Sequence, residues 1–334
     1  MKNRLWLGSR YLIVIFSLFI QVNPSVVQAD GGLSAPEFTD PAMLAQRPED
    51  WQRKPIHYES WAEKANVAIT LDQHQYAALK DAIGQFSQKT GWLVASREGN
   101  CGTSEASIDK KQVDIAGFCC PPSTRDRLPG LKYHTLGIAA LAILVHRDNP
   151  VGNLTLEEIR AIFSGRIKNW SQIIGANKLG DLPVIPVGRL HCNTRPGHWR
   201  TILPDENDFS PHLTEVGTVP DMIATVAGNP GAIGYEVLWN RTRFDRKGLV
   251  KPVWVDGISP EDDRAVASGR YPFYRVENIS SWETPSMKNA AASSLVMYLR
   301  ENVAYLNPVY RIVGYQWLRE NGWRFDGDEL IGRP

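Results

Sequence analysis

Apolar and polar positions along the chain form short apolar runs that alternate with segments of helical period. In the first part of the chain, the apolar runs are VAIT at 67–70, WLVAS at 92–96 and VDIAGF at 113–118. Between the first two runs, apolar residues recur every three or four positions before Gly91, and these residues are Tyr76, Leu79, Ile83 and Phe86. The segment 106–112 predicts a short helix or turn. This alternation predicts a parallel sheet covered by helices.

The same alternation continues through the second part of the chain. An apolar run from Ile138 to Val145 predicts a buried strand. Thr155 and Glu158 form a capping box, because a hydroxyl and a carboxylate three residues apart satisfy the free amides at a helix start. Gly165 is expected to end this helix. The remaining elements are expected to be a strand at 181–189, a helix, turn and strand across 217–238, and a helix at 289–302.

The first 29 residues have the pattern of a secretory signal peptide. Basic residues precede an apolar stretch at 11–22, and small or apolar residues lie just before Ala29. The stretch is shorter than the ~20 residues of a spanning helix, which disfavours the alternative of an uncleaved anchor. We therefore expect a periplasmic protein that begins at Asp30 and does not insert into the membrane, in a compartment where disulfides form.

Residues 30–60 are rich in Pro, Asp, Glu and Gln and have few periodic apolar positions. This composition predicts an extended N-terminal arm rather than part of a sheet. Trp51 in this arm, and Trp61 just after it, are expected to pack against the rest of the protein.

Composition and motifs narrow the classes of function. The 334 residues carry a net charge of +1 with scattered Lys and Arg, which disfavours a nucleic-acid partner or an anionic membrane surface. The sequence contains neither a Gly-x-Ser-x-Gly elbow nor a Walker loop. HCNTRPGH at 191–198 offers Cys and His, but no residue marks the third group that such a nucleophilic pair needs. We therefore do not expect an enzyme.

Five segments resemble periplasmic phosphate-binding proteins, the substrate-binding partners of phosphate ABC transporters. The longest is GIAALAILVHRDNPVGNLTLEEIRAIFSGRIKNW at 137–170. The others follow in the family's order and are VIPVGR at 184–189, GNPGAIGYEVL at 228–238, GRYPFYR at 269–275 and GYQWL at 314–318. The resemblance extends over roughly 67–318, most of the chain after the signal peptide.

The resemblance implies an α/β protein with the type-2 periplasmic binding-protein fold. Two α/β lobes would flank a ligand cleft, and the chain would cross between them twice. The first lobe would comprise 61–145 with 236–334, and the second 146–235. Ligands of this fold lie where strands end and helices begin, because backbone amides and the helix dipole favour an anion there.

The chain departs from the family in the four short segments that bind phosphate in its members. VAITLDQHQY at 67–76 has lost the small hydroxyl residues apart from Thr70. REGNCGTSEAS at 97–107 keeps Gly102 and Thr103 but contains Cys101. In DIAGFCCPPS at 114–123, Asp114 is kept, while a pair of cysteines stands where the family has a pair of serines.

The fourth segment, GRLHCNTRPGHW at 188–199, keeps Arg189, Thr194 and Arg195 but contains His191 and Cys192. All four cysteines of the chain therefore fall in segments that line the ligand site by resemblance. The ligand-binding residues implied in this way are Cys101, Gly102, Thr103, Asp114, Cys119, Cys120, Arg189, His191, Cys192 and Thr194.

Two interpretations of the cysteines remain open. An even number of cysteines in an exported protein is typical of disulfides, here from Cys101 to Cys119 or Cys120. Alternatively, the thiols form a soft-ligand site for an ion such as Cu(I), Zn(II), As(III) or Hg(II). The metal-ligating residues would then be Cys101, Cys119, Cys120 and Cys192, with His191 beside them.

The sequence therefore predicts a periplasmic solute-binding protein for an ABC-transporter permease or a membrane sensor. Because three of the four segments have lost hydroxyl donors, a buried oxyanion would be poorly held. We expect the ligand to be a thiophilic metal or metalloid species rather than free phosphate, and no other cofactor. The alternatives are an oxyanion binder with bridged cysteines, and a scaffold protein that no longer binds a ligand.

Overall fold

The computed structural model describes residues 38–334, apart from 175–180, 193 and 307 and the side chains of 304–306. The chain divides into two units, Met1–Leu33 and Ser34–Pro334, and the described residues belong to the second. The signal peptide predicted at 1–29 lies outside the described residues. In the part of the chain that is described, no helix is both long enough and apolar enough to cross a membrane.

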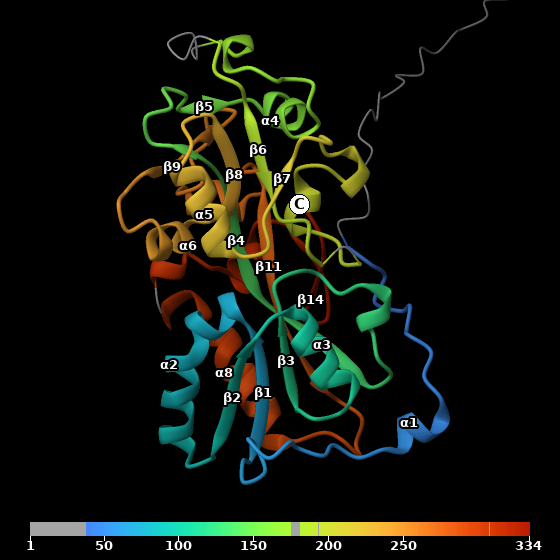
Figure 1. Ribbon diagram of the computed structural model, residues 1–334. Coiled ribbons are helices and arrows are strands. Elements are labelled where there is room, and N and C mark those ends of the chain that lie inside the picture. Colours follow the sequence, from blue (N-terminus) through green and yellow to red (C-terminus); the bar gives the residue numbers. More distant parts are fainter. Residues whose placement is uncertain (1–37, 175–180, 193, 307) are drawn as a thin grey trace, which may run out of the picture. The chain divides into compact units, whose positions relative to one another are not determined.

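The described chain folds as a mixed α/β structure (Figure 1). Its strands are β1 Val67–Asp72, β2 Val94–Gly99, β3 Ile115–Phe118, β4 Leu131–His146, β5 Asn153–Leu154, β6 Ile185–Gly188, β7 Thr214–Glu215, β8 Ala232–Val237, β9 Val250–Pro252, β10 Trp254–Val255, β11 Tyr274–Trp282, β12 Val313–Gly314, β13 Arg324–Asp326 and β14 Glu329–Gly332. Its α-helices are α1 Glu49–Arg53, α2 Gln73–Thr90, α3 Cys101–Asp109, α4 Leu156–Phe163, α5 Val219–Ala227, α6 Leu238–Phe244, α7 Asp263–Ala267, α8 Ala290–Leu306 and α9 Tyr315–Glu320. Two 3₁₀ turns near the site are η1 Thr124–Asp126 and η4 His198–Thr201.

The long strand β4 links two groups of strands into one sheet. β1 pairs in parallel with β2 and β3, and β11 lies antiparallel between β3 and the first part of β4. The second part of β4 pairs with β8 and β9, and β6 lies parallel to β8. Figure 1 shows β4 and β11 running between these two groups. The prediction of a wholly parallel sheet is therefore wrong, because β11 arrives from a distant part of the chain and enters between strands of the first group.

Most of the local predictions are confirmed. Helix α2 ends at Gly91, whose φ of 73° is the left-handed conformation that glycine favours. Thr155 and Glu158 form the expected capping box of α4. The boundaries that differ most are two starts, since β4 begins at Leu131 rather than Ile138 and α3 begins at Cys101 rather than 106. Asn100 moves the start of α3 because its side chain caps the amide of Thr103.

Two hydrophobic cores cover the two faces of the first group of strands. One is formed by β1 with α2 and α8, and includes Leu79, Ile83 and Phe86. The other, on the α3 side, contains three of the cysteines with Phe118 and Trp282. The second group of strands has a separate large core around Phe163 and Trp170. Because β10 pairs with β5, segment 254–255 packs with residues predicted for the second lobe rather than the first.

The described part of the N-terminal arm is largely extended and is held against the core on the α3 side. Trp51 donates a hydrogen bond to the carbonyl of Asp109 and packs 6.1 Å from Trp282. The ammonium of Lys111 donates to three backbone carbonyls of the arm, those of Trp51, Gln52 and Lys54. The packing expected for the two arm tryptophans is thus confirmed, with Trp61 partly buried against the same core.

Candidate functional site

Three segments that are distant in the sequence bring the four cysteines together. Cys101 is the first residue of α3, and Cys119 and Cys120 follow directly after β3. The Sγ atoms of Cys101 and Cys119 lie 3.1 Å apart, and those of Cys119 and Cys120 lie 3.9 Å apart. Cys192, from the loop after β6, contacts the thiols of Cys101 and Cys120. We call these four residues the thiol cluster; all four are free thiols, and all except Cys192 are fully buried.

The contacts within the thiol cluster shift the pKa values of two of its members in opposite directions. Hydrogen bonds from Cys101 and Cys120 lower the pKa of Cys192 to about 5. The same kind of contact, with Cys101, Cys119 and Cys192, raises the pKa of Cys120 well above its usual value. The contacts therefore favour the thiolate form of Cys192, which accepts hydrogen bonds from neighbouring thiols. A thiolate is the form of cysteine that ligates metals.

Asp72 adds a carboxyl group to the cluster, and the sequence analysis did not include it in the site. One carboxyl oxygen of Asp72 lies within 4.8 Å of the sulfur atoms of Cys101 and Cys119, a spacing that allows all three to ligate one ion. Burial, followed by the charge of Cys119, raises the pKa of Asp72 to about 8, although Arg275 opposes the shift. The signal that could have identified Asp72 is its position at the end of β1 and the start of α2, where ligands of this fold lie. Its carboxylate also caps α2 by accepting from the amide of His74.

A layer of buried charges lies next to Asp72 and is centred on Arg275 of β11. Arg275 is fully buried, donates to Nε2 of His74 at 2.7 Å, and lies 3.6 Å from a carboxylate oxygen of Glu236. Glu236 in turn lies 3.7 Å from Arg189. Burial and the nearby Arg275 lower the pKa of His74 well below its usual value, so His74 is neutral and accepts the hydrogen bond. The sequence analysis did not place Arg275 in the site. The signal that could have identified it is a charged residue within an otherwise apolar strand segment.

Several buried polar atoms around this layer lack a hydrogen-bond partner among the described residues. They are Oγ1 of Thr70, Nη2 of Arg189, Nε and Nη2 of Arg275, and both ring nitrogens of His198. Buried donors are ordinarily satisfied. Guanidinium groups with free N–H donors attract negative groups, which here include thiolates and any anionic ligand.

The structure places Asp114 away from the thiol cluster. It lies just before β3, at the opposite end of that strand from Cys119, and five extended residues span roughly 16 Å. Its carboxylate accepts hydrogen bonds from the Tyr58 hydroxyl, the Ala68 amide and the Asn289 side chain. Asp114 therefore fastens the N-terminal arm to β1 and α8, and its contact with a ligand stays a prediction.

Other predicted site residues lie beside the thiol cluster but differ in what they contact. The hydroxyl of Thr103 donates to the Asn100 side chain, so it serves the helix cap rather than the thiols. His191 bonds to the carbonyl of Arg189 and packs 4.7 Å from His198. Gly102 and Thr194 are exposed, and their contact with a ligand stays a prediction.

Ser281, His134 and Asp328 form a second polar constellation away from the thiols. His134 lies 2.9 Å from both the Ser281 hydroxyl and the Asp328 carboxylate. This order resembles a catalytic triad. However, Ser281 is only 2% exposed and lies in β11 between two paired strands, so its amide is used by the sheet. A nucleophile needs access to substrate and free amides for an oxyanion, so this constellation stabilises the sheet.

The pKa of Glu277 predicts a pH dependence of stability. Burial raises this pKa from its ordinary 4.5 to about 8, even with Arg275 nearby. Because the folded state then binds the proton more tightly, the stability from this group is present below pH 4.5 and is lost as the pH rises through 8. Glu277→Gln should flatten this fall. Urea unfolding at pH 5.5 and at pH 8, in the presence of a reductant, measures the change in the free energy of unfolding between the two pH values. An equal change in the parent protein and in Glu277→Gln would contradict the prediction.

These features define a class of protein. A mixed sheet whose two parts share one long strand, with a buried polar site where α2 and α3 begin, is the architecture of a type-2 periplasmic binding protein. A family model described as a PBP superfamily domain matches residues 58–279. The chain belongs to this superfamily, and it is similar to phosphate-binding proteins within it.

Individual relatives agree with this assignment. The chain is 24% identical over 220 residues to the phosphate-binding protein PstS of Pseudomonas aeruginosa, covering 62% of this chain and 66% of the relative. It is 29% identical over 223 residues to PstS of Bacillus subtilis, covering 65% and 70%. A putative phosphate ABC transporter substrate-binding protein from Clostridium perfringens, crystallised with phosphate, superposes with a TM-score of 0.61 at 18% identity, covering 74% of this chain and 98% of that one. The chain thus matches about two thirds of the length of these curated relatives.

Proposed function

We propose that the protein is a periplasmic solute-binding protein that captures a thiophilic metal or metalloid ion. The observation that carries the proposal is the thiol cluster, in which sulfur atoms from three separate segments meet at the buried site. Cys101, Cys119, Cys120 and Cys192 are the proposed ligands, with Asp72 next to them. Thiolate sulfur prefers soft ions, whereas phosphate needs hydrogen-bond donors.

The surroundings of the cluster support binding of a cation by thiolates. Several thiolates around one ion carry excess negative charge, and the buried guanidinium groups of Arg189 and Arg275 supply positive charge nearby. Their free N–H groups can donate to metal-bound sulfur, as outer-shell partners do in metal sites. A cation bound to deprotonated thiols also releases protons, which makes its affinity depend on pH.

By analogy with the relatives, the loaded protein would deliver its ligand to an ABC-transporter permease or report it to a membrane sensor. The two lobes of this proposal are residues 61–145 with most of 236–334, and residues 146–235. The thiol cluster would join them, since Cys192 comes from the second set of residues and the other three cysteines from the first.

A second candidate ligand is an oxyanion such as phosphate. It is favoured by Nη2 of Arg189, which lacks a hydrogen-bond partner among the described residues, and by the similarity to phosphate-binding proteins. In that case the sulfur atoms of Cys101 and Cys119, which lie 3.1 Å apart, would be oxidised to a disulfide. The loss of hydroxyl donors from the site weighs against this candidate.

The deciding experiment is alkylation of the purified protein without reductant, followed by intact mass. We expect all four cysteines to be labelled when metal-free protein is unfolded without reductant, because buried thiols react only after unfolding. In the native protein, labelling should slow when Cd²⁺ or As(III) is present at stoichiometric amounts. Metal content is recorded on the same sample, because a bound ion also blocks labelling. The soft ion should raise the unfolding temperature, by an amount that grows with the logarithm of its free concentration divided by its Kd.

Two outcomes would overturn the proposal. If two or four cysteines resist labelling until a reductant is added, and phosphate stabilises the protein, the oxyanion candidate replaces it. If all four label but neither Cd²⁺, As(III) nor phosphate protects the thiols or shifts the unfolding temperature, the protein is not a solute-binding protein for these ligands, and a scaffold role follows.

A further inference from the structure

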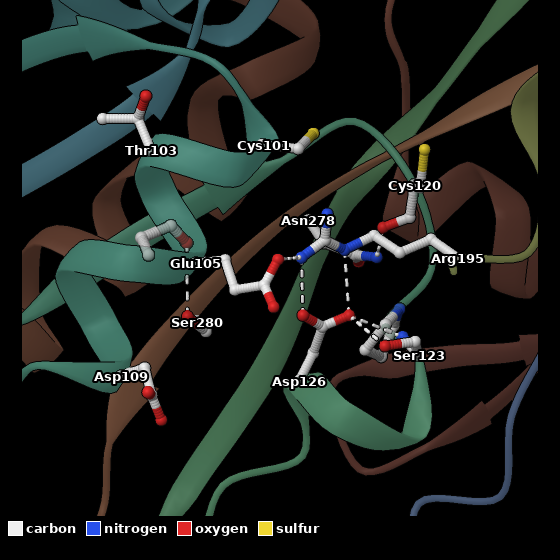
Figure 2. A network of polar contacts seen from close by, with 12 residues as sticks. Cys101, Thr103, Glu105, Asp109, Cys120, Ser123, Asp126, Arg195, Asn278 and Ser280 are labelled. Atoms are coloured by element: carbon white, nitrogen blue, oxygen red, sulfur yellow. Dashed lines mark hydrogen bonds and ion pairs between the residues drawn. The ribbon is translucent and has the colours of Figure 1, made fainter. Parts of the chain in front are cut away.

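Arg195 connects the loop that contains Cys192 to the other side of the thiol cluster. Its guanidinium lies 2.5 Å from Asp126 of η1 and 2.8 Å from Glu105 of α3. Figure 2 shows Arg195 extended between these two carboxylates, with Cys101 and Cys120 close by. Asp126 also accepts hydrogen bonds from the amide and hydroxyl of Ser123, which fix its orientation.

This ion pair is buried, which sets it apart from the surface pairs of the protein. The side chains of Arg195 and Asp126 are 3% and 1% exposed. The guanidinium also lies over the ring of Phe118, 5.1 Å from its centre. Removing one partner of a buried pair leaves an uncompensated charge, so such pairs fix one arrangement of the chain strongly.

A tight turn links Arg195 to Cys192, so the position of one depends on the position of the other. The amide of Arg195 donates to the carbonyl of Cys192 at 2.9 Å, and Cys192 has a φ of 56°. At the end of the same segment, Gly197 packs so closely on the residue after Cys120 that a Cβ there would lie 2.8 Å from Pro121. Cys192 and residues 194–197, which we call the Cys192 turn, are therefore fastened at both ends beside α3 and Cys120.

We propose that Arg195 is the positioning residue of the thiol cluster. Its pairing with Asp126 and Glu105 holds the Cys192 turn against α3, and this brings the Cys192 sulfur to Cys101 and Cys120. Without the pairing, the cluster keeps three thiols and loses the fourth. The consequence for a bound soft ion rests on the proposed function, whereas the position of Cys192 does not.

The test measures how fast Cys192 can be joined to Cys101. In a background with Cys119→Ser and Cys120→Ser, diamide oxidises the two remaining thiols to a disulfide and is itself reduced to the hydrazine. We expect Arg195→Met and Asp126→Asn to slow this reaction about tenfold or more, because small displacements of reacting groups cost large factors in rate. Arg195→Lys should lie between, since it keeps the charge but not the bidentate geometry.

Matched controls separate positioning from general stability. Arg166→Met removes an ion pair of 2.6 Å to Glu157 that is more than half exposed, and it should leave the cross-linking rate unchanged. If Arg195→Met does not fold, Arg195→Met with Asp126→Asn removes both charges together and avoids a lone buried carboxylate. The proposal is overturned if folded variants lacking the pair cross-link at the parental rate.

A parallel measurement on the four-cysteine protein uses Cd²⁺ as the probe. We expect Arg195→Met to release Cd²⁺ about tenfold faster or more, as loss of a supporting partner does in metal sites. If the parent protein does not bind Cd²⁺ but the cross-linking result holds, the proposed function fails while the role of Arg195 stands. If Cd²⁺ binds and neither rate changes in Arg195→Met, the role of Arg195 fails while the proposed function stands.

Discussion

Replacing Arg275 with methionine should lower the free energy of unfolding by about 3–5 kcal/mol, the usual cost of breaking a buried charge pair. Arg275 is fully buried, and it is the shared cation between Asp72, 3.9 Å away, and Glu236, 3.6 Å away. Its hydrogen bond to His74 is lost as well. Methionine fills much of the volume, so the loss reports charge and hydrogen bonding rather than a large cavity.

Urea unfolding in the presence of a reductant measures this loss. Arg166→Met is the matched control, because it removes a surface ion pair with Glu157 that is worth at most ~1 kcal/mol. A loss of stability for Arg275→Met no larger than that of the control would show that Asp72 and Glu236 do not depend on Arg275 for charge compensation.

Substituting Cys120 with serine should weaken binding of Cd²⁺ or As(III) at least ~100-fold, since even outer-shell changes cost 10–100-fold in metal sites. Cys120 contacts the thiols of Cys101, Cys119 and Cys192. The substitution therefore removes the one sulfur atom that contacts all the other members of the cluster. Serine keeps the shape but is a hard donor with low preference for soft ions.

Competition titration against a chelator of known affinity measures the change. Thr103→Val is the comparison, because the Thr103 hydroxyl is bonded to Asn100 and is not part of the cluster. It should change Cd²⁺ affinity less than twofold. Equal affinities for Cys120→Ser and the parent would exclude Cys120 as a ligand, and a large loss of phosphate binding in Thr103→Val would favour the oxyanion candidate.

Local features of the sequence predicted the elements well and the pairing of distant strands poorly. Gly91, Thr155 and Glu158 act within a few residues of themselves, so their effect on helix ends can be predicted from neighbours alone. The antiparallel insertion of β11 depends on contacts more than 100 residues apart, and no local pattern encodes its direction.

In the candidate site too, the features set by contiguous residues could be predicted and those set by distant residues could not. The cysteines were identified because they occupy recognisable segments, but Asp114 was assigned by that same comparison and lies at the opposite end of β3 from Cys119. Arg275 was missed as a member of the site, and Arg195 was recognised only as a retained residue of the fourth segment, without a role. Each acts through partners from other segments, Arg275 on Asp72 and Arg195 on Asp126, and such pairs become visible only when the chain is folded.

The sequence by itself determined the family, the order of most elements and the four segments that carry the cysteines, because these are properties of contiguous residues. The tertiary structure alone decided that the four thiols meet, that Asp72 adjoins them and that buried arginines surround them. The physical reason is that distances between segments, the burial that raises the pKa of Asp72 and the thiol contacts that lower the pKa of Cys192 all arise from packing of the whole chain.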